Sequence, residues 1–372
     1  MAWYVGLMSG TSLDGVDAVL AHDAPTPGAP LQAACHVGLP MPEPLRSELL
    51  ALNHAGPDEL HRAALAANAV SMLYGDAVAQ LLARARVAAA DVTAIGAHGQ
   101  TVRHRPQAFG GTGYTLQLLN AALLAERTGI DVVCDFRSRD VAAGGQGAPL
   151  VPGFHAACFT QPGADVAVLN LGGIANLTLL RADGTVRGFD CGPGNLLMDL
   201  WCGRHRDAPY DAGGAWASGG RVDALLLECL LAEPFFGEPP PKSTGRDLFG
   251  ATWLDERLGA GTIPPQDVMA TLAELTARSA VDALCRHAPA TTSLLVCGGG
   301  AFNAHLMNRL AALLAGRATV RTTAAAGLPP DQVEALAFAW LAQAHVDRRP
   351  GNLPAVTGAK GPRILGALYP AL

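Results

Sequence analysis

The sequence lacks a run of apolar residues long enough to span a membrane, and its first residues show no basic segment followed by an apolar one. Neither a transmembrane helix nor a secretory signal peptide is therefore expected. Charged residues are also few, at 16%, whereas 50% of the 372 residues are hydrophobic. A chain of this length and composition can bury a large core in two domains, which excludes a mainly disordered protein.

The eight cysteines are far apart in the sequence and form no Cys-x-x-Cys pair. This spacing favours free thiols in a reducing cytosol over a disulfide framework or a zinc site, so we expect a cytoplasmic protein. The net charge of −6 argues against a nucleic-acid partner, because binding a phosphate backbone requires concentrated positive charge. It does not argue against ATP, since a few backbone N–H groups and a metal ion can hold a triphosphate.

Residue periodicity predicts an α/β protein. We expect strands at 3–9, 15–22, 30–39, 91–97, 166–171, 174–180, 186–190, 293–297 and 318–321. Helices are expected at 58–87, 195–204, 222–232, 266–286, 303–314 and 331–345. Three strands with a glycine turn occur near residue 3 and again near residue 166, which we interpret as an architectural repeat. The glycine-rich loop at 135–152 is a candidate domain junction, and the prolines at 239–241 indicate a long surface loop or lid.

The first chemical motif is the turn at residues 6–17, which is rich in Gly, Ser and Thr. Such a turn exposes backbone N–H groups and hydroxyls that suit phosphate oxygens. Asp14 or Asp17 could orient Mg²⁺ through water. An ordinary hairpin closed by Asp-Gly is an equal alternative, and the Gly-Lys-Ser/Thr ending of a Walker loop is missing.

Two further glycine turns follow. Paired glycines at 172 and 173, within residues 170–176, allow a backbone to approach a ligand, although a bulged hairpin is the better explanation when this segment is taken alone. Residues 297–303 place three glycines before a helix, which is a suitable place for a nucleotide. Because residue 303 is Asn, the GxGxxG spacing of a dinucleotide site is not satisfied.

Asp190 precedes Gly-Pro-Gly and a helix, so it is expected to be held rigidly at a strand end. Such a carboxylate can take a proton from a water or hydroxyl nucleophile. A turn or N-cap role is the alternative. Polar residues at 98–101, 135–140 and 242–246 lie in predicted loops, where ligands often bind. Each group also has an explanation that needs no ligand. His98 could be a structural histidine, and Arg137 and Arg139 could form salt bridges with Asp135 and Asp140. Residues 242–246 could be a surface turn, and Glu334 a solvated charge on a helix.

Taken together, these segments resemble the anhydro-N-acetylmuramic acid kinase family, in the actin, sugar-kinase and heat-shock ATPase superfamily. The matching segments occur in the family's order from about residue 5 to residue 366: GLMSGTSLDGVDAVL, GAHGQTVRHRP, DFRSRDVAAGGQGAPLVPGFH, LNLGGIANLT, FDCGPGNLLMDLW, KSTGRDLF, DVMATLAELTA, VCGGGAFNAHLMNRL, DQVEALAFAWLA and PGNLPAVTGA. Two departures are visible, Cys191 in place of an expected Thr and Asp247 in place of an expected Glu.

The resemblance implies two lobes, each a mixed sheet with flanking helices, that close over a cleft. The expected division is 1–134, which the C-terminal segment could complete, and 135–372. The implied base is Asp190. The implied ATP site comprises Gly10, Thr11, Ser12, Leu13, Asp14, Gly15, Val16, Asp17, Gly172, Gly173, Gly298, Gly299 and Asn303. The implied sugar-site residues are His98, Gln100, Asp135, Asn195 and Glu334.

The implied reaction opens 1,6-anhydro-N-acetylmuramic acid with water and phosphorylates O6 from Mg·ATP, giving N-acetylmuramic acid 6-phosphate and ADP in peptidoglycan recycling. The implied ligands are a small sugar and ATP, with no nucleic acid or membrane, and a homodimer is left open. Three alternatives remain at this point: a kinase of another hexose or amino sugar, a glycoside hydrolase, and a non-catalytic nucleotide-binding protein of the same fold.

Overall fold

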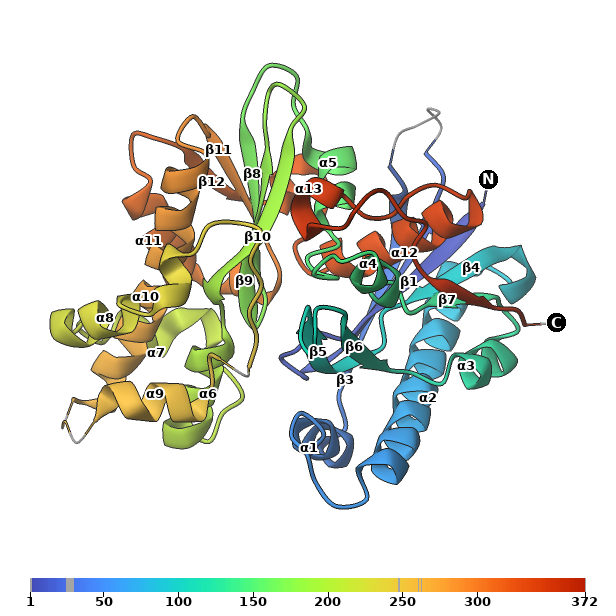
Figure 1. The fold of residues 1–372 in the computed structure, drawn as a ribbon, viewed down its shortest axis with the longest axis horizontal. Coiled ribbons are helices and arrows are strands. Elements are labelled where there is room, and N and C mark those ends of the chain that lie inside the picture. The colour runs from blue at the N-terminus through green and yellow to red at the C-terminus, as the bar shows by residue number, and fades with distance from the viewer. Residues whose placement is uncertain (1, 25–29, 247, 260, 262, 372) are drawn as a thin grey trace. The chain divides into compact units, whose positions relative to one another are not determined.

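The computed structural model describes residues 2–24, 30–246, 248–259, 261 and 263–371. The chain forms two compact units, the first comprising residues 1–158 and 332–372 and the second residues 159–331 (Figure 1). The boundary therefore falls later than the expected one after residue 134. The reason is that residues 135–158 pack with the C-terminal segment: buried Asp140 accepts hydrogen bonds from Asn352 Nδ2 (2.7 Å) and Thr357 Oγ1 (2.8 Å).

The first unit is built on a six-stranded sheet with the order β13-β7-β4-β1-β2-β3. Strands β1, β4 and β7 are parallel neighbours, whereas β1, β2 and β3 pair in antiparallel fashion. A separate hairpin is formed by β5 and β6. The strands are β1 (Trp3–Met8), β2 (Gly15–His22), β3 (Gln32–Pro40), β4 (Val92–Ala97), β5 (Gln100–Pro106), β6 (Gly113–Leu118), β7 (Val132–Cys134) and β13 (Ala367–Tyr369).

Helix α12 lies directly on this sheet because two neighbouring strands carry glycines. Gly6 of β1 and Gly96 of β4 are paired in register. A Cβ at Gly6 would lie 2.7 Å from the backbone nitrogen of Ala339, and one at Gly96 would lie 2.7 Å from the carbonyl carbon of Phe338. The helices of this unit are α1 (Glu43–Ala51), α2 (Glu59–Ala85), α3 (Ala121–Thr128), α4 (Ser138–Ala142), α5 (Pro152–Phe159, which ends across the boundary), α12 (Val333–Val346) and α13 (Pro354–Thr357).

The second unit repeats this arrangement around a five-stranded sheet of order β10-β9-β8-β11-β12. Strands β8, β9 and β10 are antiparallel, and β8, β11 and β12 are parallel, as are β1, β4 and β7 in the first unit. The architectural repeat predicted from the sequence is thus confirmed. The strands are β8 (Val166–Leu171), β9 (Ile174–Leu180), β10 (Val186–Pro193), β11 (Ser293–Cys297) and β12 (Thr319–Thr322).

The helices of the second unit enclose a large apolar core. They are α6 (Leu196–Arg206), α7 (Ala215–Ser218), α8 (Ala224–Leu231), α9 (Ala251–Leu258), α10 (Pro265–His287) and α11 (Ala304–Leu313), with the short 3₁₀ turn η3 (Pro234–Gly237) before the proline loop. Every helix and strand expected from the sequence is present. The elements that were not expected include the helices α1, α3, α4, α5, α7, α9 and α13 and the strands β5, β6, β7 and β13. All eight cysteines lie in the described residues and carry free thiols.

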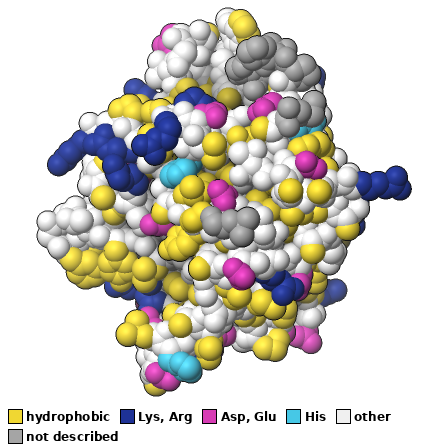
Figure 2. All heavy atoms as spheres, turned by 90° about the vertical axis from the view of Figure 1, so that its right-hand side faces the viewer, with side chains coloured by type: hydrophobic (Ala, Val, Ile, Leu, Met, Phe, Trp, Pro, Cys, Tyr) yellow, Lys and Arg dark blue, Asp and Glu magenta, His cyan; other side chains and the backbone are white. Residues whose placement is uncertain are grey.

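On the face drawn in Figure 2, hydrophobic and acidic side chains are interspersed, and the largest group of Lys and Arg side chains stands at one edge. Among the described residues, no helix combines the length and the apolar character needed to cross a membrane.

Candidate active site

In the first unit, the predicted site residues follow the carboxyl ends of three parallel strands. The phosphate-loop candidate follows β1, His98 follows β4 and Asp135 follows β7. Because the carboxyl ends of parallel strands meet at one edge of a sheet, these segments share that edge. Glu334 lies one helical turn before Phe338, whose ring centroid is 4.8 Å from that of His98. The N-terminal end of α12, with Glu334, is therefore at the same edge.

The loop from Ser9 to Asp14 is fixed by buried polar contacts. Ser9 Oγ shares a hydrogen bond of 3.0 Å with the Tyr74 hydroxyl and donates to the Gly99 carbonyl at 3.2 Å. Gln100 Nε2 donates to the Gly10 carbonyl at 3.2 Å. These contacts hold the loop in one conformation, with the backbone of Leu13 in the left-handed region at φ +58°.

The positions assigned to the first phosphate loop divide into two kinds. The side chains of Leu13 and Val16 are buried in the core of the first unit, so only their backbone could face a nucleotide. By contrast, Thr11 and Asp14 are exposed, and Gly10, Ser12, Gly15 and Asp17 are partly exposed. A Cβ at Gly15 would lie 2.5 Å from the Leu39 carbonyl oxygen, so that glycine is required for packing.

The two candidate metal carboxylates differ in their partners. Asp17 Oδ1 lies 2.9 Å from His36 Nε2, so this carboxylate is already paired across β2 and β3. Asp14 Oδ1 accepts a hydrogen bond of 2.8 Å from Ser12 Oγ at the exposed tip of the loop. Among the described residues, no group of three or more His, Cys, Asp or Glu side chains is arranged to hold a metal ion. Any cation here would rely on water and on ligand oxygens for most of its shell.

His98 is a neutral, buried imidazole. Arg137 donates to its Nε2 from Nη2 at 3.0 Å and from Nε at 3.3 Å. Burial, and then the charge of Arg137, lower the pKa of His98 to about 3. With Nε2 accepting, the proton is on Nδ1, which has no hydrogen-bond partner in the described part of the chain. The buried Oε1 of Gln100 also lacks a partner there, so a donor and an acceptor are available for a ligand.

The segment after Asp135 is fixed by the buried side chain of Asp140. Asp135 is exposed and lies in the left-handed region at φ +54°. The carboxylate of Asp140 is buried and accepts from the Gly147 nitrogen at 2.8 Å, besides Asn352 and Thr357. Asp140 therefore secures the glycine-rich loop to the C-terminal segment.

In the second unit, three glycine segments meet at the carboxyl edge of the sheet. Gly194 N donates to the Gly173 carbonyl at 2.9 Å, and Asn195 N donates to the Gly172 carbonyl at 2.8 Å. Asn195 Nδ2 donates to the Leu171 carbonyl at 3.0 Å. Gly298 has φ +79°, and a Cβ there would lie 2.9 Å from the carbonyl carbon of Leu171. The turns after β8, β10 and β11 are thus packed together. Residues of the second unit that are proposed to bind one ATP molecule must lie close to one another in this way.

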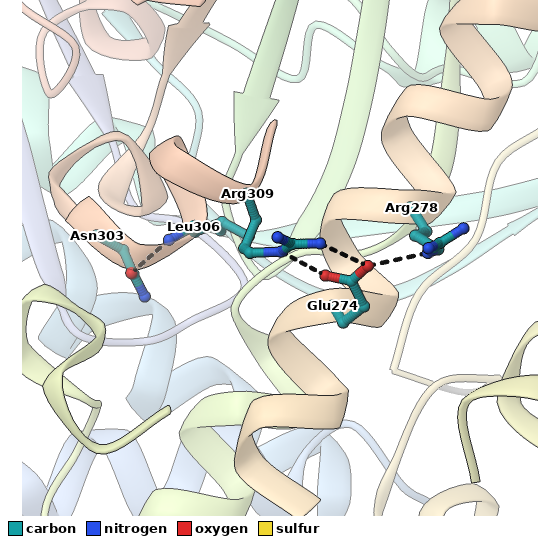
Figure 3. A network of polar contacts seen from close by, with 5 residues as sticks. All are labelled: Glu274, Arg278, Asn303, Leu306 and Arg309. Carbon is teal, nitrogen blue, oxygen red and sulfur yellow. Dashed lines mark hydrogen bonds and ion pairs between the residues drawn. The ribbon is translucent and has the colours of Figure 1, made fainter. Parts of the chain in front are cut away.

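Asn303, assigned to the nucleotide from the sequence, is the N-cap of α11. Its side-chain oxygen accepts from the Leu306 nitrogen at 3.0 Å, as Figure 3 shows. On the same helix, Arg309 donates to buried Glu274 at 2.7 and 3.1 Å, and Arg278 donates to it at 2.9 Å. Burial alone would raise the pKa of Glu274, but the two arginines outweigh it and leave this pKa below its usual value. The helix that follows the third glycine turn is therefore rigidly fixed.

Asp190 lies near the carboxyl end of β10 rather than after it. The strand continues to Pro193 through a bulge between Asp190 and Gly192, so the expected strand end at residue 190 is corrected. The Asp190 side chain is 8% exposed, and its Oδ2 accepts from the Thr244 backbone nitrogen at 2.9 Å. Its own backbone nitrogen donates to the Lys242 carbonyl at 3.1 Å. The carboxylate is held from the strand and from the loop beside it.

Residues around Asp190 were only partly anticipated. Cys191, where Thr was expected, donates from Sγ to the Ala175 carbonyl at 3.2 Å, a bond that a Thr hydroxyl could also make. Burial raises the pKa of this thiol, so it stays protonated. Residues 242–246 are predicted to be either a ligand-binding loop or a surface turn, but the first of them, Lys242, is buried. The other departure, Asp247, lies outside the described residues. Ser9 and Thr244 were missed because their contacts come from distant residues.

Two α/β units with one strand order, and with glycine turns at the carboxyl edges of both sheets, define the actin-like ATPase and sugar-kinase class of fold. Within this class, the chain belongs to the anhydro-N-acetylmuramic acid kinase family, whose family model matches residues 2–371. It is therefore an enzyme, a kinase that transfers a phosphoryl group to a sugar.

The relatives agree with this assignment over the whole length. The anhydro-N-acetylmuramic acid kinase of Bordetella petrii is 62% identical, covering 99% of this chain and 96% of the relative. That of Albidiferax ferrireducens is 57% identical and covers 99% of both chains. Among solved structures, the activator of 2-hydroxyisocaproyl-CoA dehydratase from Clostridium difficile is 12% identical with a TM-score of 0.46, covering 93% of this chain and 96% of that one. A likeness of that degree has no bearing on function.

Proposed function

We propose that the enzyme opens the 1,6-anhydro bridge of anhydro-N-acetylmuramic acid with water and phosphorylates the released O6 from ATP. The products are N-acetylmuramic acid 6-phosphate and ADP, and the role is peptidoglycan recycling. The observation that carries the proposal is the rigid Asp190 carboxylate, positioned by the Thr244 nitrogen near the carboxyl edge where the glycine turns of the second unit meet. The family membership supplies the sugar.

The substrate requires a base that acts on water. Its O6 is tied to C1 and has no proton to give, so an ordinary attack of a hydroxyl on the γ-phosphate cannot begin the reaction. Asp190 takes a proton from water, and the hydroxide oxygen bonds to C1 as the C1–O6 bond breaks. O6 then bonds to the γ-phosphorus as the bond to ADP breaks. A positioned general base contributes about 10²–10⁴-fold to such a rate.

Within each unit, backbone N–H groups of glycine turns are the candidates for phosphate oxygens: Gly10–Gly15 in the first unit, and Gly172–Gly173 with Gly298–Gly299 in the second. Asn303 contributes through the helix that it caps. Between the candidate carboxylates, Asp14 fits Mg²⁺ better, since it is exposed and Asp17 is paired with His36. When bound, Mg²⁺ neutralises charge on the transferring phosphoryl group. The residues of this chain provide position: Ser9 and Gln100 hold the loop that carries Asp14.

We assign the sugar to residues with buried polar atoms that have no partner in the described part of the chain. His98 Nδ1 can donate to a substrate oxygen, and Gln100 Oε1 can accept from a hydroxyl or amide. Leaving such atoms unpaired costs about 1–3 kcal/mol each, a cost that a bound polar ligand removes. Asp135 and Glu334 are proposed on the same edge of the sheet, and Asn195 beside the glycine turns.

The variant Asp190→Asn tests the proposal, with Asp183→Asn as the matched control. Asp183 is an exposed carboxylate in a hairpin of the same unit. We expect Asp190→Asn to lose about 10²–10⁴-fold in kcat while it still binds ATP, because a base and not a phosphate contact is removed. Asp183→Asn should retain full turnover. Wild-type turnover by a folded Asp190→Asn protein would rule out the assignment of the base.

A further inference from the structure

Lysine is rare in this chain: only Lys242 and Lys360 occur among the 26 basic Lys and Arg residues. Lys360 is exposed, as expected for a charged side chain, but Lys242 is 7% exposed. Burying an ammonium group costs free energy unless it is well paired. A buried lysine therefore needs specific partners, and its position beside the loop that contacts Asp190 calls for a reason.

The ammonium of Lys242 is anchored on Phe235. Its Nζ donates to the Phe235 carbonyl at 2.7 Å and stands 4.3 Å from the centroid of the Phe235 ring. Phe235 is itself fixed in an aromatic cluster, with its ring centroid 5.7 Å from that of Phe249, which lies 5.0 Å from that of Trp253. The lysine is thus tied to a rigid part of the core of the second unit.

The backbone of the same residue reaches Asp190. Strand β10 is an edge strand, so its outer N–H and C=O groups need partners other than a neighbouring strand. The Lys242 carbonyl accepts from the Asp190 nitrogen at 3.1 Å, and two residues later the Thr244 nitrogen donates to Asp190 Oδ2 at 2.9 Å. Residues 242–244 form a strap along the edge of β10, and the strap holds both the backbone and the carboxylate of Asp190.

We propose that Lys242 is a positioning residue for the reaction: its buried ammonium fixes the strap, and the strap fixes the Asp190 carboxylate. The inference rests on the proposed role of Asp190 as the base. In this role Lys242 does not touch the substrate, because its Nζ is hydrogen-bonded to the Phe235 carbonyl in the core of the second unit. A displacement of about 1 Å at a catalytic group can cost roughly 10²-fold in rate, so a loosened strap lowers kcat with the chemistry otherwise intact.

The first test replaces the ammonium by an apolar group of similar length. Lys242→Met is expected to lower kcat at least tenfold, with the KM for ATP within twofold of wild type. Lys360→Met is the matched control, since it removes the other lysine at an exposed position, and it should have wild-type kcat. An unchanged kcat in Lys242→Met, or a rise in the KM for ATP that accounts for the whole loss, would overturn the proposal.

The second test separates this proposal from the assignment of the base. Because Lys242 acts through Asp190, adding Lys242→Met to Asp190→Asn should lower the residual kcat by less than twofold. A further tenfold loss in the double variant would show that Lys242 acts by another route, even if Asp190 is the base. Full activity of Asp190→Asn alone would instead remove the proposed function. If Lys242→Met is unfolded at the assay temperature, Lys242→Gln, which keeps a neutral donor, is measured against the same two criteria.

Discussion

At the scale of single residues, the geometry of the glycine turns depends on the fact that glycine has no Cβ atom. Gly298 has φ +79°, which L side chains rarely adopt, and its Cα faces the end of β8. A Cβ there would lie 2.9 Å from the Leu171 carbonyl oxygen and closer still to Asn170 Oδ1. The turn after β11 can approach β8 only because this atom is absent, and the same approach creates the proposed nucleotide site.

Gly298→Ala should therefore be destabilising and should weaken ATP binding. Gly184→Ala is the matched control, because Gly184 has φ +84° and nothing within 4 Å of its would-be Cβ. Both variants place a side chain at positive φ, but Gly298 also has ψ 176°, a conformation nearly exclusive to glycine, so Gly298→Ala adds further backbone strain and about 1–3 kcal/mol of overlap. Chemical denaturation and the KM for ATP measure the two effects. Equal losses in both variants would contradict the packing account.

The buried position of His98 predicts how the free energy of unfolding depends on pH. Burial, and next Arg137, hold its pKa at about 3, whereas an unfolded chain binds this proton near pH 6.5. Below 6.5 the unfolded state therefore takes up more protons, so the free energy of unfolding falls as the pH drops from about 6.5 towards 3. The slope from one such group is at most about 1.4 kcal/mol per pH unit.

Replacing His98 by Gln should flatten this slope, and His61→Gln should leave it unchanged because His61 is exposed. Urea titrations at pH 7, 6, 5 and 4 would show the difference. His155, also buried with a pKa lowered to about 3, adds a parallel slope that remains in both variants. A slope in His98→Gln as steep as that of the wild type would contradict a neutral His98.

At the scale of elements, the position of Glu334 depends on how α12 lies on the first sheet. The helix crosses β1 and β4 at Gly6 and Gly96, and its C-terminal part reaches Asp23, to which Gln343 donates at 2.8 Å. Asp23 is at the amino end of β1, where its carboxylate accepts from the Ala2 nitrogen at 3.1 Å. The helix therefore runs opposite to β1 and brings its N-terminus to the carboxyl edge, where His98 lies.

Gly6→Ala should prevent this packing. The added Cβ would overlap the carbonyl oxygen of Ala335 and lie 2.7 Å from the Ala339 nitrogen, so either the helix or the strand must move. We expect a loss of about 3 kcal/mol or more in the free energy of unfolding, and a lower kcat because Glu334 moves with α12. Gly38→Ala on β3, where the nearest atom would be 3.5 Å away, should cost little. A melting temperature for Gly6→Ala equal to that of Gly38→Ala would contradict the account.

The sequence predicts those elements whose signal is local. The apolar strands β8 and β9 and the long periodic helices α2 and α10 are examples, and they were expected close to their observed positions. The hairpin β5–β6 was missed because β5, with the sequence QTVRHRP, has only Val102 as an apolar residue before its final proline and so gives no alternating strand pattern. The domain boundary was misplaced because Asp140 pairs with Asn352 and Thr357, more than 200 residues later.

The same distinction applies to the site. Asp190, His98 and the glycine turns could be proposed as site residues from the sequence because each lies within a continuous motif. The partners that fix them could not be identified in this way, because Thr244 meets Asp190, and Arg137 meets His98, only in the folded chain. Asn303 was assigned to the nucleotide, but its side-chain oxygen caps α11, a role that depends on where the helix begins.

At the scale of the whole molecule, each of the two units has the same arrangement of strands and carries glycine turns at the carboxyl edge of its sheet, where we propose that phosphates bind. Membership of the anhydro-N-acetylmuramic acid kinase family establishes a sugar kinase. What distinguishes the proposed reaction from that of other sugar kinases is water: a kinase of a free hydroxyl adds only a phosphoryl group, and a glycosidase adds only water.

The most direct measurement is the mass of the sugar product formed by the purified wild-type protein from 1,6-anhydro-N-acetylmuramic acid and Mg·ATP, with ADP release followed in parallel. The account predicts a product heavier than the substrate by one water and one phosphoryl group, formed in equal amount to ADP and absent without ATP. A product that gains the phosphoryl group alone, or water alone without ATP, would contradict it.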